Sequence, residues 1–260
     1  MRGACAARPR IATGTPSWQH WAARRRGDFE IPLPEGVPAD REHHDQQYPK
    51  RDSCPRTTAR TPGDPGHVDL NPAEPRSWMT RIVEIAVSLH SLDLPAKLLR
   101  PWTDSWIAPL DGFQVPVDAQ RPAVWKAAFG VMAAPAPDDT PVFLHGDLLP
   151  VNMLWSRGRI TGLTDWNSIH RGARAIDVGH CRRYMAALYS PEWSGQFRSL
   201  YESIAGVTLD PWWDLYALLH HDDSAPKWIR GQVAGRRPVD VPGMTARIEV
   251  AIETALRHLG

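Results

Sequence analysis

The residues best suited to chemistry stand close together in the second half of the chain. The sequence reads FLHGDLLPVNMLW from residue 143 and, one short loop later, GLTDW. His145, Asp147 and Asn152 have the spacing H-x-D-x-x-x-x-N, and Asp165 follows thirteen residues after Asn152. Carboxylate and amide oxygens suit Mg²⁺ bound together with phosphate oxygens, and a further carboxylate can accept the proton of a hydroxyl group. The pattern therefore indicates phosphoryl-transfer chemistry.

Two short strands are predicted to bring these side chains together. Residues 152–155 and 160–164 have strand-like composition, and the four-residue loop between them contains a glycine, as hairpins often do. When the residues that flank the loop pair, Asn152 comes opposite Leu163. Asn152 and Asp165 then meet at the open end of the hairpin.

With these residues in view, the chain resembles the aminoglycoside phosphotransferase and choline kinase-like family, distant relatives of the protein kinases. HGDLLPVNMLW is similar to the family's catalytic loop, and LTDW stands where protein kinases have their metal-binding DFG. The resemblance extends from about Gly66 to the end, through segments 67–72, 177–180 and 211–219. It implies a protein-kinase-like α+β fold, mainly the helical C-terminal lobe with a short catalytic-loop hairpin.

The resemblance also implies roles for single residues. Asp147 corresponds to the catalytic base, and His145 belongs to the same catalytic loop as a residue that braces it. Asn152 and Asp165 correspond to the ligands of the Mg²⁺ that accompanies ATP. The implied reaction moves the γ-phosphate of ATP to a hydroxyl of a small molecule, either aminoglycoside-like or another small alcohol.

Hydrophobic periodicity predicts the helices around this loop. Trp78, Ile82, Ile85 and Leu89 recur at helical spacing after Ser77, a possible helix cap, and predict one buried stripe. Val142 begins a short apolar strand that runs directly into the His-Gly-Asp segment. The predicted helices span residues 77–90, 124–132, 175–189, 196–204, 211–220 and 245–258.

The first 65 residues differ from the rest in composition. They contain four Ile, Leu or Val residues, nine prolines and eleven Arg or Lys residues. Ordering each residue costs about 1 to 2 kcal/mol of backbone entropy, and so few aliphatic side chains offer little burial to offset it. We therefore divide the chain into a Pro/Arg-rich segment, 1–65, expected to be disordered or outside the family, and a phosphotransferase C-lobe, 66–260.

A kinase-like fold also needs a second lobe with a phosphate-covering loop and a lysine for the α- and β-phosphates. No glycine-containing strand-loop-strand pattern precedes Gly66, and Lys50, the only lysine before Lys97, lacks an apolar strand around it. This lobe is expected to be missing or degenerate, which predicts weak Mg-ATP affinity and turnover near background. The composition of residues 1–65 is also what a shifted reading frame over GC-rich DNA would produce.

Other classes of function remain open on the residues alone. A catalytically dead remnant that binds a small ligand is the main alternative, and a hydrolase with a metal held by His145, Asp147 and Asp165 is a more distant one, since one histidine makes a poor zinc site. Asp177 is interpreted as a helix cap, with a link to the catalytic loop as the alternative. Four aromatic residues could form a surface for a quaternary ammonium, or simply core: Trp193, Trp212, Trp213 and Tyr216. Five acidic residues could dock a polyamine, or form a solvated face: Glu202, Asp210, Asp214, Asp222 and Asp223.

Composition narrows the partners. Thirty Lys and Arg residues against 29 Asp and Glu residues give a net charge of +1, which argues against nucleic acid as a partner. No apolar stretch reaches the roughly 20 residues that a membrane helix needs. The three cysteines, Cys5, Cys54 and Cys181, have no metal-ligand spacing and predict reduced thiols in a cytoplasmic protein. The expected partner is a small hydroxyl-bearing substrate, and no pattern indicates an oligomeric state.

Overall fold

The elements of the fold are known for most of the chain after residue 66. The computed structural model describes residues 67–95, 97, 99–104 and 113–259. Segment 1–65 and Lys50 lie outside the described residues, so the division of the chain at residue 66 and the state of a second lobe stay predictions. The helices are α1 (Pro75–His90), α2 (Pro122–Met132), α3 (Ala175–Leu188), α4 (Pro191–Ala205), α5 (Pro211–Leu219), α6 (Ala225–Val233) and α7 (Met244–Arg257). The strands are β1 (Val142–Leu144), β2 (Met153–Ser156), β3 (Arg159–Leu163) and β4 (His170–Gly172).

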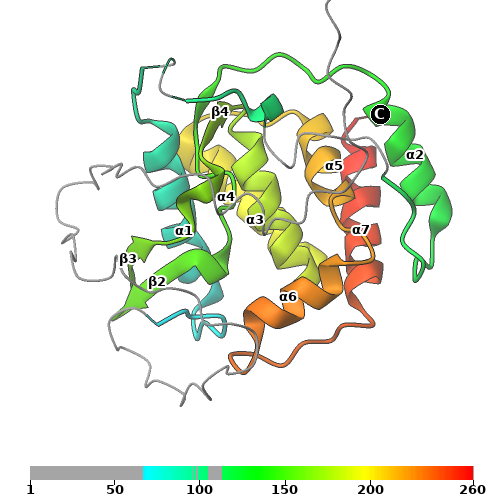
Figure 1. Ribbon diagram of the computed structural model, residues 1–260. Helices are drawn as coiled ribbons and strands as arrows, with labels where there is room; N and C mark the ends of the chain where they lie inside the picture. The colour runs from blue at the N-terminus through cyan, green and yellow to red at the C-terminus, as the bar shows by residue number, and fades with distance from the viewer. Residues whose placement is uncertain (1–66, 96, 98, 105–112, 260) are drawn as a thin grey trace, which may run out of the picture. The chain divides into compact units, whose positions relative to one another are not determined.

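Helix α3 forms the centre of the described part of the chain (Figure 1). It packs against α4, α5 and α7, and each of its residues is buried. The close contact with α5 depends on Gly179, because a Cβ atom there would lie 2.5 Å from the Cβ of Ala217. A helix covered on all sides has no solvent face, which is why α3 carries little amphipathic periodicity.

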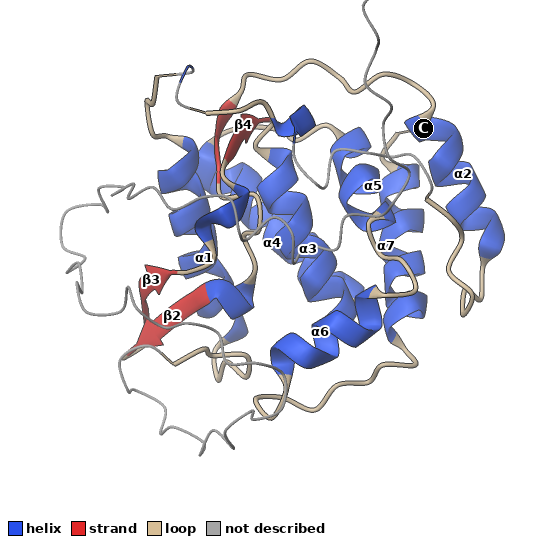
Figure 2. Ribbon diagram, in the orientation of Figure 1, coloured by secondary structure: helices blue, strands red, loops and turns tan. Residues whose placement is uncertain are grey.

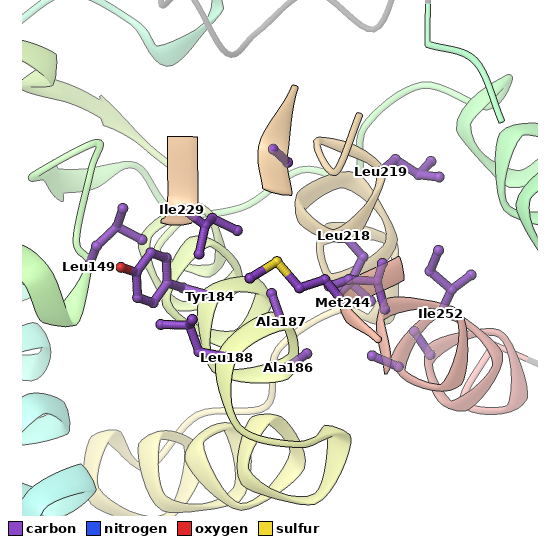
Figure 3. Packing of buried hydrophobic residues seen from close by; sticks show 14 of the residues in the cluster. Leu149, Tyr184, Ala186, Ala187, Leu188, Leu218, Leu219, Ile229, Met244 and Ile252 are labelled. Carbon is purple, nitrogen blue, oxygen red and sulfur yellow. The ribbon is translucent and has the colours of Figure 1, made fainter. Parts of the chain in front are cut away.

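The main hydrophobic core lies between the C-terminal half of α3 and the three last helices. Figure 3 shows Tyr184 and Leu188 of α3 beside Ile229 of α6 and Met244 of α7. The rings of Tyr184 and Trp228 stack with centroids 6.5 Å apart, which joins α6 to α3. Burial of these apolar side chains holds the helical part together.

Proline and short polar residues set where several helices begin. Ser190 and Asp210 accept hydrogen bonds from the backbone N–H groups of Trp193 (3.4 Å) and Trp212 (2.8 Å), and a proline follows each of them at the first helical position. This combination of cap and proline starts α4 five residues earlier than the apolar pattern predicted. In α1 the expected cap at Ser77 is wrong, because the helix already begins at Pro75.

The buried face of α1 differs slightly from the predicted stripe. Trp78, Ile82 and Leu89 are buried as expected, but Ile85 is only half-buried. Val83 and Ala86, both 0% exposed, take its place in the core. The buried face of α1 is therefore rotated toward residues 79, 83 and 86.

The strands form two small antiparallel pairs (Figure 2). In the β2–β3 hairpin Trp155 pairs with Ile160, as predicted. The loop is shorter than expected, because Ser156 pairs with Arg159 and only Arg157 and Gly158 turn the chain. Both of these residues have positive φ, 51° and 71°, as a type I′ turn requires. β1 pairs with β4, a strand too short to give a sequence signal.

The expected fold class is confirmed: the described part is α+β, with helices predominating and a short hairpin that closely follows the segment His145–Asp147. The six predicted helices are all present, whereas α6 was not predicted. Within the described ranges, every helix is too short or too polar to cross a membrane. Cys181 is a buried free thiol.

The rotated stripe of α1 gives a stability test. Ile82→Ala should lower the free energy of unfolding by about 2 to 5 kcal/mol, because it removes a fully buried side chain. Ile85→Ala, the matched control on the half-buried side, should cost less than about half as much. Urea unfolding followed by circular dichroism measures both values, and equal losses would contradict the assigned face.

Candidate functional site

The segment His145-Gly146-Asp147 follows β1 as a loop, and a side chain of α3 binds its backbone. Asp177 of α3 accepts a hydrogen bond from the backbone N–H of His145 through Oδ2 and one from that of Gly146 through Oδ1, both at 2.8 Å. The carboxylate is fully buried. The interpretation of Asp177 as a helix cap is therefore wrong, and the alternative, a link to the catalytic loop, is what the structure has.

Gly146 allows the loop to pass close to the chain that follows the hairpin. Its φ is +78°, a conformation that residues with a side chain rarely adopt. A Cβ atom at this position would lie 1.8 Å from the carbonyl oxygen of Ser168. Any side chain here would push the loop away from Ser168 and displace the neighbouring aspartate.

Asp147 is held by Asn152 at the end of this loop. The Nδ2 group of Asn152 donates to Oδ2 of Asp147 at 3.0 Å and to its backbone carbonyl at 2.9 Å. Burial, followed by the negative charge of Asp165, raises the pKa of Asp147 to about 6, although the hydrogen bond from Asn152 and the positive charge of Arg183 oppose the rise. A carboxyl group with such a pKa is suited to accepting and releasing a proton near neutral pH.

Asn152 and Asp165 come together through the backbone. The predicted register is wrong by one residue at this end of the hairpin, because the pairing shifts between Leu154 and Trp155 and Leu163 lies opposite Met153. The N–H of Thr164, the residue before Asp165, donates to the carbonyl of Asn152 at 2.9 Å. Asp165 is exposed and has a left-handed backbone conformation, φ 64° and ψ 54°, which aspartate tolerates better than most residues. Asn167 donates to its Oδ1 at 2.9 Å.

The donor set at this position fits a magnesium ion that arrives with phosphates. Because Nδ2 of Asn152 is used toward Asp147, its Oδ1 is the atom left to act as a ligand, and Asp165 adds carboxylate oxygens. Two oxygen ligands from the protein, completed by phosphate and water, is a common arrangement for Mg²⁺. No group of three or more His, Cys, Asp or Glu residues is arranged as a metal site in the described part of the chain.

His145 has the contacts of a bracing residue. Its Nε2 donates to the carbonyl of Thr164 at 3.1 Å, and its Nδ1 accepts from the N–H of Asp147 at 3.3 Å. This pair of partners requires the neutral ring with the proton on Nε2. Burial lowers the pKa of His145, in agreement with the neutral form. The ring thus joins the loop to the segment that carries Asp165.

A second buried histidine, His90 of α1, was not singled out from the sequence. Its Nε2 lies 3.3 Å from Oδ2 of Asp177, and its Nδ1 lies 2.6 Å from the hydroxyl of Tyr201 in α4. The only signal for it was its position at the C-terminal end of the buried face of α1. Burial alone would raise the pKa of Asp177, but the interactions with His90 and His145 lower it.

Arg183 is the other unpredicted residue near the site. It is 5% exposed, and its Nη1 donates to the carbonyl of His220 at 2.5 Å. Its guanidinium carbon lies 5.5 Å from the centre of the Trp228 ring. Burial lowers the pKa of Arg183 to about 10, while the negative charge of Asp147 raises it. The group is therefore a cation at neutral pH and partly balances the negative charge of Asp147.

The aromatic and acidic residues considered for substrate docking have mostly structural contacts. Trp212, Trp213 and Tyr216 are buried, so the interpretation as core holds for them, and half-buried Trp193 stacks on Tyr189 with centroids 4.4 Å apart. Each of the five acidic residues accepts internal hydrogen bonds: Glu202 from Arg198 and the Leu209 N–H, Asp210 and Asp222 as caps, Asp223 from the Val117 N–H, and Asp214 from Arg182 and Arg198. The interpretation as a solvated face is wrong for Asp214, which is 3% exposed.

Comparison with known proteins identifies the family. The profile of a family described as "Phosphotransferase enzyme family" matches residues 17–217, a range that contains the whole catalytic loop and Asp177. The match begins inside segment 1–65, which composition had set apart. No curated protein matches the chain.

Solved structures of similar proteins have low sequence identity. A putative aminoglycoside phosphotransferase from Ralstonia eutropha JMP134 is 14% identical, with 74% of this chain and 70% of that chain covered and a TM-score of 0.42. A choline/ethanolamine kinase family protein from Mesorhizobium loti is 19% identical, with coverages of 75% and 74% and a TM-score of 0.39. An amicoumacin kinase is 16% identical, with a TM-score of 0.43, and this chain, 75% covered, spans 63% of it. Since the family profile spans well over half of the chain and includes the residues of the catalytic loop, the chain belongs to the phosphotransferase enzyme family.

Proposed function

We propose that this protein transfers the γ-phosphate of ATP to a hydroxyl group of a small molecule. The observation that carries the proposal is the placement of Asp147. Its carboxylate is oriented by Asn152, has a pKa near 6, and feels the charge of Asp165 at the open end of the hairpin. One carboxylate suited to proton transfer thus stands beside an amide and a second carboxylate suited to a metal ion.

In the proposed reaction Asp147 orients the hydroxyl of the acceptor by accepting its hydrogen bond. As the acceptor oxygen attacks the γ-phosphorus, a new P–O bond forms, the bond to the β-phosphate oxygen breaks, and ADP leaves with the electron pair. The hydroxyl proton passes to Asp147 and later to solvent. Asn152 keeps the carboxylate turned toward the acceptor throughout, because both of its donor hydrogens are bonded to Asp147.

Asn152 and Asp165 would hold Mg²⁺ together with the phosphates of the nucleotide. Bound there, the ion supplies positive charge that stabilises the phosphate oxygens during transfer. The exposed position of Asp165 suits this role, because its carboxylate can bind an ion that arrives with ATP. The neutral ring of His145 fixes the distance between the loop of Asp147 and the segment of Asp165 through the carbonyl of Thr164.

The acceptor in this proposal is a small alcohol, and a direct screen is the test. The full chain, [γ-³²P]ATP and Mg²⁺ are incubated with separate acceptors: an aminoglycoside, a macrolide, choline, ethanolamine and neutral sugars. Label transferred to at least one acceptor, and lost in Asp147→Asn, supports the proposal. Thermal stabilisation by an acceptor without any stabilisation by Mg-ATP would instead favour a ligand-binding module and overturn the transfer reaction.

The proposed roles of the two carboxylates predict different losses. Asp165→Ala should weaken binding of Mg²⁺ with a non-hydrolysable ATP analogue by about tenfold or more, because it removes a metal ligand. Asp147→Asn should change that affinity by less than about threefold and abolish transfer, since the base is lost but the fold of the loop is kept. Titration calorimetry measures the first value and the label assay the second.

Asp138 offers a matched control for both variants. It is an exposed aspartate that precedes β1 and lies outside the site. Asp138→Ala should leave affinity and transfer as they are in the wild type. Equal losses of nucleotide affinity in the Asp147 and Asp165 variants would argue against separate roles for base and metal ligand.

The raised pKa of Asp147 predicts a pH-dependent cost in stability. In the metal-free protein this pKa is about 6, against an ordinary value of 3.8. Because the folded state holds the proton more tightly, the stabilising contribution is complete below about pH 4 and is lost as the pH rises through about 6. Asp147→Asn does not titrate, so it should gain stability relative to the wild type by up to about 3 kcal/mol between pH 4 and pH 7.5.

Urea unfolding in the presence of a chelator at several pH values measures this difference. Asp138→Asn, which removes an exposed carboxyl group, should show no such gain. A constant difference between the wild type and Asp147→Asn across the pH range would mean that the pKa of Asp147 is not raised.

A further inference from the structure

A cavity lies at the C-terminal end of α3, and its volume is about 380 Å³. Six residues line it: Asn71, Pro72, Tyr189, Ser190, Trp193 and Arg237. Tyr189 follows Asp177 by about 18 Å along the helix axis, so the cavity is separate from the contact between α3 and the loop of Asp147. We propose that the cavity is a docking site for a proline-rich segment of a partner protein in the polyproline II conformation.

Two stacked aromatic rings form part of the cavity wall. The rings of Tyr189 and Trp193 are nearly parallel, with centroids 4.4 Å apart. Both side chains are half-buried, and both contact the ring of Trp78, at 5.9 Å and 6.2 Å between centroids. Trp78 is itself buried and stacked on Trp155. Because the buried rings hold the outer pair in place, little side-chain freedom remains to be lost when a ligand binds.

Two hydrogen-bond donors of the cavity residues have no partner. Within the described part of the chain, Nε1 of Trp193 and Nη2 of Arg237 take part in no hydrogen bond. Arg237 is nevertheless fixed, because its Nη1 donates to the carbonyl of Leu70 at 3.2 Å and its guanidinium carbon lies 4.1 Å from the centre of the Tyr189 ring. The cavity therefore offers two well-placed donors to a ligand.

The acceptors of the polar side chains in the cavity are already in use. Oδ1 of Asn71 accepts from Nη1 of Arg237 at 3.4 Å, and Oγ of Ser190 accepts from the N–H of Trp193, also at 3.4 Å. A ligand that brought N–H groups into the cavity would find few partners for them. The side chains thus favour a ligand that has acceptors and lacks donors.

The charges around the cavity favour a neutral ligand. The guanidinium of Arg237 repels a cation, which disfavours a quaternary ammonium at this position. Two carboxylates disfavour a free anion: that of Glu192, whose pKa is lowered by a hydrogen bond with Ser190, and that of Asp69, whose charge adds to the effect of burial in raising the pKa of Tyr189. A carbonyl oxygen accepts hydrogen bonds without carrying a net charge.

A polyproline II segment has the required properties. Proline has no N–H, its ring is apolar, and the carbonyl groups of this conformation make no internal hydrogen bonds. In the proposed complex, proline rings pack on Trp193 and Pro72, while carbonyl groups accept from Nε1 of Trp193 and Nη2 of Arg237. Aromatic-lined grooves recognise proline-rich segments in this way, because the conformation exists before binding and costs little entropy.

Decaproline is the probe for this proposal, and the test needs no transfer activity. Fluorescein-labelled decaproline is titrated with the full chain, and fluorescence anisotropy should show saturable binding, whereas a labelled decapeptide of glycine and serine should not bind. In NMR spectra the indole N–H of Trp193 should shift on addition of decaproline, and that of Trp228, a half-buried residue outside the cavity, should not. No saturable binding up to about 1 mM protein, or a shift of Trp228 alone, would overturn the proposal.

Two substitutions locate the contact. Trp193→Phe keeps an aromatic ring and removes Nε1, and Arg237→Met keeps most of the length of the side chain and removes its donors. Each should weaken decaproline binding by about fivefold or more. Arg236→Met is the matched control and should bind as the wild type does, since Arg236 is exposed and its Nη1 binds the carbonyl of Gln232. Equal losses in the Arg236 and Arg237 variants, or no loss in Trp193→Phe, would contradict docking in this cavity.

Two competitors distinguish other occupants. Sodium phosphate at constant ionic strength should not displace decaproline, and displacement would mean that the cavity is an anion site and would overturn the proposal. An unlabelled peptide with the sequence of residues 31–40, IPLPEGVPAD, should compete no better than decaproline. Much tighter competition by this peptide would assign the cavity to a segment of this chain and overturn the assignment to a partner protein.

Discussion

The loop that carries Asp147 depends on one buried carboxylate, that of Asp177. It accepts three N–H groups, from His145, Gly146 and His90, in a place from which water is excluded. A buried charge is tolerated only where such donors surround it, so the loop, α3 and α1 must adopt their positions together. The geometry of Asp147 is a consequence of this arrangement, because the residue follows directly after the two amides that Asp177 binds.

Helix α3 is also joined to its neighbouring helices by a buried ion pair. Arg182 of α3 and Arg198 of α4 both bind the carboxylate of Asp214 in α5, which is itself buried. Breaking such a pair on one side leaves an uncompensated buried charge, which is costly, so the three helices are held in a single relative arrangement. Ion pairs thus hold part of the helical structure next to the loop in place, and the apolar cluster around Tyr184 and Leu188 holds the rest.

Around Asp147, negative charges are less well compensated than around Asp177. Asp147 and Asp165 repel each other, and only the buried cation of Arg183 and the amide of Asn152 act in the other direction on Asp147. Such a concentration of negative charge lowers stability in the metal-free protein. In the proposed function it would attract a divalent cation and prepare the carboxyl group of Asp147 for proton transfer. Burial of apolar side chains between the helices stabilises the fold and offsets this loss.

The sequence by itself determined the family, the pairing of Trp155 with Ile160 and the positions of six helices, because motif spacing, helical periodicity and turn glycines are local properties. It misjudged the phase of α1 at Ile85 and the start of α4, where neighbouring helices and a Ser-Pro cap decided. Asp177, His90 and Arg183 received their roles only from tertiary structure. Their partners are 32, 111 and 37 residues away along the chain, and no local pattern records which buried donor will meet which acceptor across such separations.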